Sequence, residues 1–484
     1  MSKKRSVVKN YIYNLSYQIL ILILPLVTTP YISRVLGAEN IGIYSYTLSI
    51  SAFFILFGSL GIALYGKREI AYLQKDKKNY SKAFWEILIL RVITMLISMM
   101  IFYFTFARNG EYQNYYKILL LEIIANCIDI SWFFQGLEEF KKTVIRNMIV
   151  KLISVVCIFT FVKTKQDLTI YFIIYVLSIL VGNGSLWLYL PKYLERVKLK
   201  HINIVKHLKP TFSLFLPQIA IEVYTLLDRT MIGMIITDKS EVGFYDQGQK
   251  IIKMLLTIIT SLGTVMLPRI ANTFASGKKK KINKYMRKSF NMVYLLAFPM
   301  IFGIISVSKD FVPKFFGQGY DKVALIISVI SPIILFIGIS NVIGTQYLLP
   351  TKRQKEYTIS VVCGAIVNFI MNYCLIFKYG AIGASIGTIV AELVVALVQV
   401  YYVRKDFNLK KVFKLMKNYI IASLIMFIVC LIIRNIVRKP YFSMALQVVI
   451  GGIVYLTSLI ILEDKFVFEI IDRIRKKVKI KGST

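Results

Sequence analysis

Two stretches of this chain, about 200 residues apart, carry the same short pattern and decide how the fold is interpreted. The first is Asn40-Ile-Gly-Ile-Tyr44, which is followed by Ser59-Leu-Gly61 and Arg68-Glu-Ile-Ala71. The second is Glu241-Val-Gly-Phe-Tyr245, which is followed by Ser261-Leu-Gly263 and Arg269-Ile-Ala271. The shared order and spacing favour an internal duplication, and the alternative is chance similarity between apolar helices. Internal duplication is a recurring construction of transporters.

A second pair of matches supports the duplication. Asn126, Trp132-Phe-Phe134 and Thr143 recur at an offset of roughly 215 residues. The corresponding residues are Asn341, Tyr347-Leu-Leu349 and Thr358. Because both pairs occur in the same order, we expect two lobes of similar construction.

The composition places the chain in a membrane. Its 484 residues are 57% hydrophobic, and the mean hydropathy is +0.64. Apolar stretches of about 18 to 25 residues, each long enough to cross ~30 Å of hydrocarbon, recur along the whole chain. We therefore predict an all-α polytopic membrane protein with about 14 transmembrane helices.

The net charge of +36 would suggest nucleic-acid binding in a soluble protein, but its distribution has another explanation. About 43 of the 61 lysines and arginines lie at the two ends and in every second loop. This alternation is typical of a membrane protein whose positive loops stay inside. It predicts cytoplasmic N- and C-termini and no nucleic-acid partner.

The charge pattern and the repeats together predict three parts. Residues 1–195 would form an N-terminal six-helix lobe, and residues 196–405 a C-terminal six-helix lobe. Residues 406–484 would add two further transmembrane helices and a basic cytoplasmic tail. An even number of spans in each repeat gives both lobes the same orientation, so the duplication is parallel.

Cysteines and histidines predict no metal or catalytic centre. The five cysteines lie in apolar stretches without CxxC spacing, so they are interpreted as packing residues. The two histidines, His201 and His207, lie apart in a basic loop. There is no ATP-binding P-loop and no serine–histidine arrangement. We therefore expect no catalytic residues, no metal and no resident cofactor, with H+ or Na+ as candidate coupling ions.

Polar side chains inside the predicted spans mark a candidate cavity. Ionisable groups at bilayer depth are expensive, and they usually face a cavity or a partner. A cluster of cations would bind phosphate oxygens well. The candidates for substrate binding are Arg229, Lys250, Lys253, Arg91, Arg34, Asn14, Gln18 and Gln218. The candidates for ion coupling are Glu222, Asp129, Asp228 and Glu392. The alternative for each of them is a buried salt bridge or an interhelical hydrogen bond.

The N-terminal motifs resemble a known family. They are Asn14-x-x-x-Gln18, Leu24-Pro25, Arg34-Val-Leu-Gly37, Gly42-x-Tyr44, Ser59-Leu-Gly61 and Arg68-Glu-Ile-Ala71. Together they resemble the signature of Wzx-type polysaccharide-repeat-unit flippases, in the polysaccharide transporter family of the multidrug/oligosaccharidyl-lipid/polysaccharide exporter superfamily. The resemblance extends over the chain in span count and in the six-plus-six layout.

This resemblance implies a function and a location. A member would move an undecaprenyl-pyrophosphate-linked oligosaccharide from the inner to the outer leaflet of the bacterial plasma membrane, by alternating access. Its partners would be the lipid bilayer and the polymerase and glycosyltransferases of capsule, O-antigen or exopolysaccharide assembly. Two alternatives stay within the superfamily, a lipid II flippase and a small-molecule or cation antiporter. A membrane polysaccharide polymerase or ligase is disfavoured because the outward loops are short.

Overall fold

The computed structural model describes residues 7–197 and 202–481, and the regular elements in these ranges are all helices. The helices gather into two compact units, Met1–Gly243 and Phe244–Thr484. The predicted all-α class is therefore confirmed. The predicted division at residues 195 and 405 stays a prediction, because a division by packing does not test where one repeat ends.

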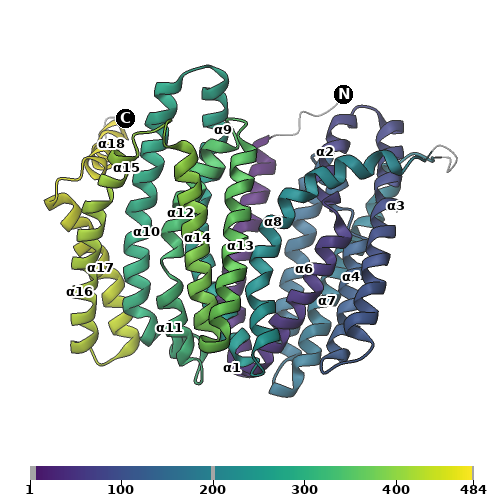
Figure 1. Ribbon diagram of the computed structural model, residues 1–484, viewed down its shortest axis with the longest axis horizontal. Coiled ribbons are helices and arrows are strands. Elements are labelled where there is room, and N and C mark those ends of the chain that lie inside the picture. Colours follow the sequence, from purple (N-terminus) through teal and green to yellow (C-terminus); the bar gives the residue numbers. More distant parts are fainter. Residues whose placement is uncertain (1–6, 198–201, 482–484) are drawn as a thin grey trace. The chain divides into compact units, whose positions relative to one another are not determined.

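The first unit contains eight α-helices, of which α2 and α5 are short. The helices are α1 (Val7–Ser59), α2 (Ile62–Leu73), α3 (Lys77–Phe102), α4 (Gln113–Cys127), α5 (Ser131–Gly136), α6 (Phe140–Phe161), α7 (Leu168–Ser185) and α8 (Val205–Ile235). Helix α8 packs against α1, α2 and α3, which explains why it belongs to this unit (Figure 1).

The second unit begins within α9 (Ser240–Ala275). The helices that follow are α10 (Lys279–Phe316), α11 (Asp321–Ile330), α12 (Ile333–Ser340), α13 (Gln354–Tyr379), α14 (Ala381–Val403), α15 (Leu409–Lys414), α16 (Met416–Ile436), α17 (Pro440–Ile461) and α18 (Lys465–Lys481). A π-helical segment, Asn341–Leu348, continues α12. The closest packing in this unit joins α13 to α14, where a methyl group at Gly383 would lie 2.4 Å from the carbonyl oxygen of Leu375.

Twelve helical stretches of the described residues are long and apolar enough to cross a membrane. The first of them, Leu20–Leu73, contains two of the spans expected from the sequence, because α1 consists of two helices that meet at Gly37. Gly37 has φ 79° and ψ 171°, a backbone conformation that glycine adopts without the strain that a Cβ would add. Another expected span lies in α8, which has 31 residues. The structure is thus consistent with about fourteen spans, and the number itself stays a prediction.

The two copies of the duplicated motif touch each other. A methyl group at Gly42 would lie 1.6 Å from the carbonyl oxygen of Lys239, and one at Gly243 would lie 2.2 Å from that of Ala38. The same offset of 201 residues relates Gly42 to Gly243 and Ala38 to Lys239. The contact is therefore reciprocal, and the backbones approach so closely that each position requires glycine.

Lys239 fixes the turn that brings α9 to this contact. Its ammonium donates hydrogen bonds to the carbonyl oxygens of Gly233 and Ile236 at the end of α8, at 2.7 and 3.0 Å. The same group lies 5.1 Å from the ring centre of Tyr46. A cation at a helix C-terminus satisfies carbonyl groups that have no partner within the helix.

After this contact the two copies differ. In the first copy, Leu60 and Gly61 have φ values of 44° and 72°, so α1 ends and α2 begins. In the second copy, Ser261-Leu-Gly263 lies inside the continuous helix α9. Helix α2 can therefore turn against α5, where Gly66 leaves room for the ring of Trp132.

The last two predicted spans, α16 and α17, both pack against α10 within the second unit (Figure 1). The Tyr455 hydroxyl donates a hydrogen bond to the carbonyl oxygen of Leu295 at 2.9 Å. The Arg434 Nε lies 3.2 Å from a carboxylate oxygen of Asp310. These contacts anchor the helix pair to the middle and to the C-terminal part of α10.

We predict that Gly42→Ala lowers the free energy of unfolding by about 1–3 kcal/mol, because the added methyl group would have to displace the backbone at Lys239. Thermal unfolding of the purified protein in detergent measures the loss. Gly452→Ala is the matched control, since Gly452 lies in α17 and nothing lies within 4 Å of its Cβ position. Equal stability of the Gly42 variant and the wild type would contradict the close contact.

Candidate functional site

Arg91 in α3 is buried against the end of α4. Its side chain is 3% exposed, and its Nε and Nη2 donate hydrogen bonds to the carbonyl oxygen of Asn126 at 2.9 and 2.6 Å. Asp129 lies 3.9 Å from Nη2, and its carboxylate also accepts hydrogen bonds from Ser131. Arg91 and Asp129 therefore stabilise the break between α4 and α5, and the roles predicted for them in binding and ion coupling stay predictions.

Glu122 in α4 holds three helices together. Its carboxylate is buried and accepts hydrogen bonds from the Ser51 hydroxyl at 2.8 Å and the Tyr175 hydroxyl at 2.9 Å. These partners come from α1 and α7. Two hydroxyl donors reduce the cost of burying a carboxylate, as interhelical hydrogen bonds do inside membranes.

The cations of α6 present a different environment. Lys151 lies midway along the membrane-spanning stretch Lys141–Phe161, and it is exposed. Arg146 lies on the same helix and donates to the carbonyl oxygen of Gly182 at 2.6 Å and to Asn183 at 3.1 Å. Both cations line a cavity of about 180 Å³ that also includes Ser178. Among the described residues, Lys151 forms no salt bridge, so its charge is available to a ligand.

Lys151 is not among the binding candidates chosen from the sequence. Its position at the middle of an apolar helix is the signal that could have placed it among the binding candidates. A lysine at bilayer depth that lacks an acidic partner is expected to face water or a bound anion. Within the first unit, Lys151 is the best-placed cation for that role.

Helix α9 carries the candidate cations of the second unit. The Lys250 ammonium lies 2.7 Å from a carboxylate oxygen of Asp246, one helical turn away, and Asp246 is buried. Lys253 is exposed, as is Ser261 two turns further on. The charge of Lys250 is therefore partly neutralised by Asp246 on the same helix, whereas Lys253 lies at the surface of the unit.

The remaining candidates lie in varied surroundings. Arg34 and Glu222 are exposed, Arg229 is half-buried, and Asp228 and Glu392 are buried. The side chains of Asn14, Gln18 and Gln218 lie outside the part of the structure that is described. The roles assigned to all these residues stay predictions.

A polar network that the sequence did not indicate joins the start of α8 to α2 and α3 within the first unit. Glu86 is fully buried, and it lies 3.0 Å from His207 Nε2 and 2.7 Å from the Lys206 ammonium. The Tyr65 hydroxyl lies 2.6 Å from His207 Nδ1, and the backbone N–H of Asn203 donates to Glu86 at 2.8 Å. His207, expected in a loop, thus lies in the first turn of a helix, and the network fixes α8 to α2 and α3.

The described residues contain no group of three or more histidine, cysteine, aspartate or glutamate side chains that could hold a metal ion. His201 lies outside those residues. The expectations about cofactors and coupling ions therefore remain predictions.

Curated relatives span most of this chain. A protein named "Putative O-antigen transporter" from Escherichia coli (strain K12) is 25% identical over 84% of this chain and 98% of its own length. The capsular polysaccharide biosynthesis protein CapF of Staphylococcus aureus is 24% identical over 82% and 99%, respectively. These names support the expectation that the chain is not an enzyme.

Solved structures share the fold. The lipid II flippase MurJ in an inward closed conformation has a TM-score of 0.77 at 19% identity, covering 94% of this chain and 99% of that one. A multidrug resistance MATE family transporter of the MOP superfamily, in an inward-facing conformation, has a TM-score of 0.61 at 11% identity, covering 81% and 96%. At these identities the likeness shows the fold alone.

Family models agree with the relatives and with the resemblance to Wzx-type polysaccharide flippases, which is confirmed. The MatE model matches residues 214–374. The model described as "Polysaccharide biosynthesis protein" matches residues 7–274, which is more than half of the chain. The chain therefore belongs to the polysaccharide biosynthesis protein family.

Proposed function

We propose that this protein is a flippase for a lipid-linked oligosaccharide. The observation that carries the proposal is the family match over residues 7–274, in a chain that has the fold of a lipid II flippase. The names of the E. coli and S. aureus relatives support a role in O-antigen or capsule assembly. The cargo would be an undecaprenyl-pyrophosphate-linked repeat unit, supplied by glycosyltransferases and consumed by a polymerase.

We further propose that the protein lies in the bacterial plasma membrane with both termini in the cytoplasm. Support comes from the alternation of lysine-rich and lysine-poor loops. In this orientation Gly37 and the turn at Lys239 lie on the outer side, and the junction of α1 and α2 at Gly61 lies on the inner side.

The pyrophosphate would bind to cations at bilayer depth. Lys151 and Arg146 on α6 and Lys253 on α9 are accessible in their own units, and lysine and arginine suit phosphate oxygens. Arg91 is a weaker candidate, because the carbonyl oxygen of Asn126 already accepts two of its hydrogen bonds. The lipid tail would remain in the bilayer while the sugars cross.

The contact between α1 and α8 would have to open during transport. The Ser49 and Thr230 hydroxyl oxygens lie 2.7 Å apart and are buried, and Tyr46 packs where Gly233 lacks a side chain. The proposed orientation places this contact toward the outer side of the membrane. Alternating access requires such a contact to separate when the sugar is released outward.

For energy we propose no resident cofactor and a gradient of H+ or Na+. Asp228 and Glu392 are the buried carboxylates among the candidates, at 3% and 9% exposure. Buried carboxylates in membrane helices are typical elements of ion pathways. Asp129 is a weaker candidate, because Arg91 and Ser131 account for its position.

The function is tested in proteoliposomes that carry a labelled undecaprenyl-pyrophosphate oligosaccharide, read out by an impermeant reagent that destroys outward-facing label. We expect flipping by the wild type and a loss of about tenfold or more in Lys151→Gln, because a charge-assisted contact contributes about 1.5–3 kcal/mol.

Lys163→Gln is the matched control, since Lys163 is exposed beyond the end of the same helix. No flipping of this lipid by the wild type would overturn the proposed function. Preferential flipping of lipid II would favour the lipid II alternative. Equal rates for the two lysine variants would remove Lys151 from the binding site.

Alternating access is tested with a Ser49→Cys/Thr230→Cys double variant in which the five native cysteines have been replaced. Because the two hydroxyl oxygens are 2.7 Å apart, the new thiols are expected to form a disulfide under oxidation. We expect the oxidised protein to stop flipping and the reduced protein to resume. Undiminished flipping with complete cross-linking would contradict opening at this contact.

Ion coupling is tested with Asp228→Asn and Glu392→Gln in the same vesicles. We expect at least one of these variants to flip at a rate that no longer depends on the imposed H+ or Na+ gradient. Glu222→Gln serves as the control, because Glu222 is exposed. A wild type that is insensitive to both gradients would show that neither ion drives transport.

A further inference from the structure

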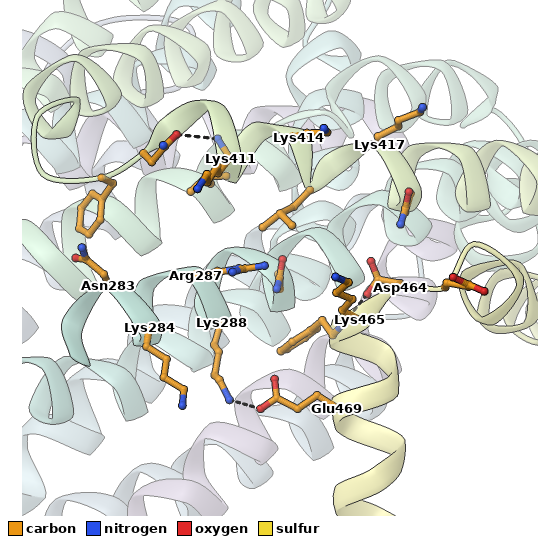
Figure 2. Close-up of a pocket in the computed structure, with 18 residues that line it drawn as sticks. Asn283, Lys284, Arg287, Lys288, Lys411, Lys414, Lys417, Asp464, Lys465 and Glu469 are labelled. Carbon is orange, nitrogen blue, oxygen red and sulfur yellow. Dashed lines mark hydrogen bonds and ion pairs between the residues drawn. The ribbon is translucent and has the colours of Figure 1, made fainter. Parts of the chain in front are cut away.

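A large basic pocket lies in the second unit, apart from the intramembrane cations. It has a volume of about 1000 Å³ and lies among the start of α10, the helices α15 and α16, and the start of α18. In Figure 2, Lys411, Lys414 and Lys417 lie along one side, and Arg287 and Lys288 lie along the facing side. Lys284 and Lys465 complete the set of seven cations.

Two of the three acidic residues that line this pocket are already engaged. Glu469 pairs with Lys288, as Figure 2 shows, and with Arg473 at 2.6 Å. The hydrogen bond from Lys288 lowers the pKa of the Glu469 carboxyl, so this carboxylate stays ionised and paired. Asp464 is buried and accepts hydrogen bonds from the Tyr419 hydroxyl and from backbone N–H groups at the start of α18. Only Glu463 remains as an exposed acid.

The other six cations have no acidic partner among the described residues. They are Lys284, Arg287, Lys411, Lys414, Lys417 and Lys465. Six such charges around one cavity repel one another and attract an anion. A phosphate group is the expected ligand, because arginine and lysine side chains bind its oxygens with charge-assisted hydrogen bonds.

A buried polar group in the pocket lacks a partner. Asn291 in α10 lines the pocket and is 6% exposed, and its Oδ1 has no hydrogen-bond partner among the described residues. A buried polar atom left unsatisfied costs about 1–3 kcal/mol. A ligand that brings a hydroxyl group beside its phosphate would supply the missing donor.

The surroundings indicate that the phosphate is carried by a lipid. The spans α10 and α16 begin at the pocket and α17 ends beside it, so the pocket lies at the level of the membrane surface. Helices α15, α17 and α18 expose apolar side chains near the pocket, namely Phe413 at 38%, Ile461 at 79% and Phe468 at 40%. Apolar groups beside a cationic pocket suit a molecule with an anionic head and an acyl or prenyl tail.

We propose that this pocket binds the phosphate-bearing headgroup of a lipid in the leaflet that faces the basic side of the protein. Two lipids carry this chemistry, an anionic phospholipid of the bilayer and the polyprenyl-pyrophosphate of the proposed cargo. The inference does not depend on transport, because the pocket is built entirely within the second unit from residues outside the intramembrane candidates.

The test measures lipid binding to the purified full-length protein by native mass spectrometry. The probes are phosphatidylglycerol, undecaprenyl pyrophosphate, phosphatidylcholine and inorganic pyrophosphate. We expect the Arg287→Gln/Lys411→Gln/Lys417→Gln variant to bind its preferred anionic lipid at least about tenfold more weakly than the wild type, since each cation near a membrane surface adds attraction. Thermal unfolding in detergent confirms that the variant is folded.

A variant with Lys278→Gln, Lys279→Gln and Lys280→Gln is the matched control. It loses the same charge from exposed positions near the start of α10 that do not line the pocket. A loss of lipid affinity that is confined to the pocket variant supports the inference. Whichever of the two anionic lipids binds more tightly is identified as the ligand of the pocket. Equal losses in both variants, equal affinity for phosphatidylcholine, or binding of inorganic pyrophosphate as tight as that of either lipid would overturn it. Because binding is measured without transport, a protein that binds but does not flip would contradict only the proposed function.

Discussion

The cost of placing a charge in hydrocarbon is the constraint on which the arrangement of this protein depends. Each ionisable group inside a span must find a partner or face water. Arg91 donates hydrogen bonds to the carbonyl oxygen of Asn126, and Glu122 accepts hydrogen bonds from two hydroxyl groups. Asp246 forms an ion pair with Lys250 on its own helix. The contacts of Arg91 and Glu122 fasten helices to one another, whereas that of Asp246 lies within one helix. Lys151 has no such pair among the described residues, and it is therefore the cation whose position structural needs do not explain.

The sequence predicted what depends on local composition. The length of the apolar stretches identified the spans, and the distribution of lysines among the loops predicted an orientation. Each of these quantities is a property of a single segment. The sequence also identified the repeated motif, but it could not show that Gly42 and Gly243 pack against the backbone of the opposite copy. That contact arises only when α1 and α9 are brought together. The helix break at Leu60 and Gly61 could not be predicted either. Both residues have positive φ values, whereas the same Ser-Leu-Gly sequence in the second copy is helical.

The candidate site was harder to predict, because spacing along a helix shows which residues share a face but not which partner they meet. The stripe pattern therefore placed both Arg91 and Lys253 among the binding candidates, although one is buried against a carbonyl group and the other is exposed. Glu86 and His207 are 121 residues apart, so no local pattern could join them. His207 was expected in a loop because it lies in a basic segment. In the structure it lies in the first turn of α8, where it contacts the buried carboxylate of Glu86.

The two C-terminal spans, which the sequence predicts to be an addition to the two repeats, border the basic pocket. Both α16 and α17 pack on α10. In this packing, the lysines of α15 and α16 lie opposite the cations of α10. Repulsion between these positive charges disfavours the arrangement unless an anion is present. Burial of Tyr455 and the pairing of Arg434 with Asp310 hold the helices there despite that repulsion. Contacts along the length of α10 thus stabilise a basic cavity at its end, and a lipid headgroup is the anion that a membrane surface supplies at that depth.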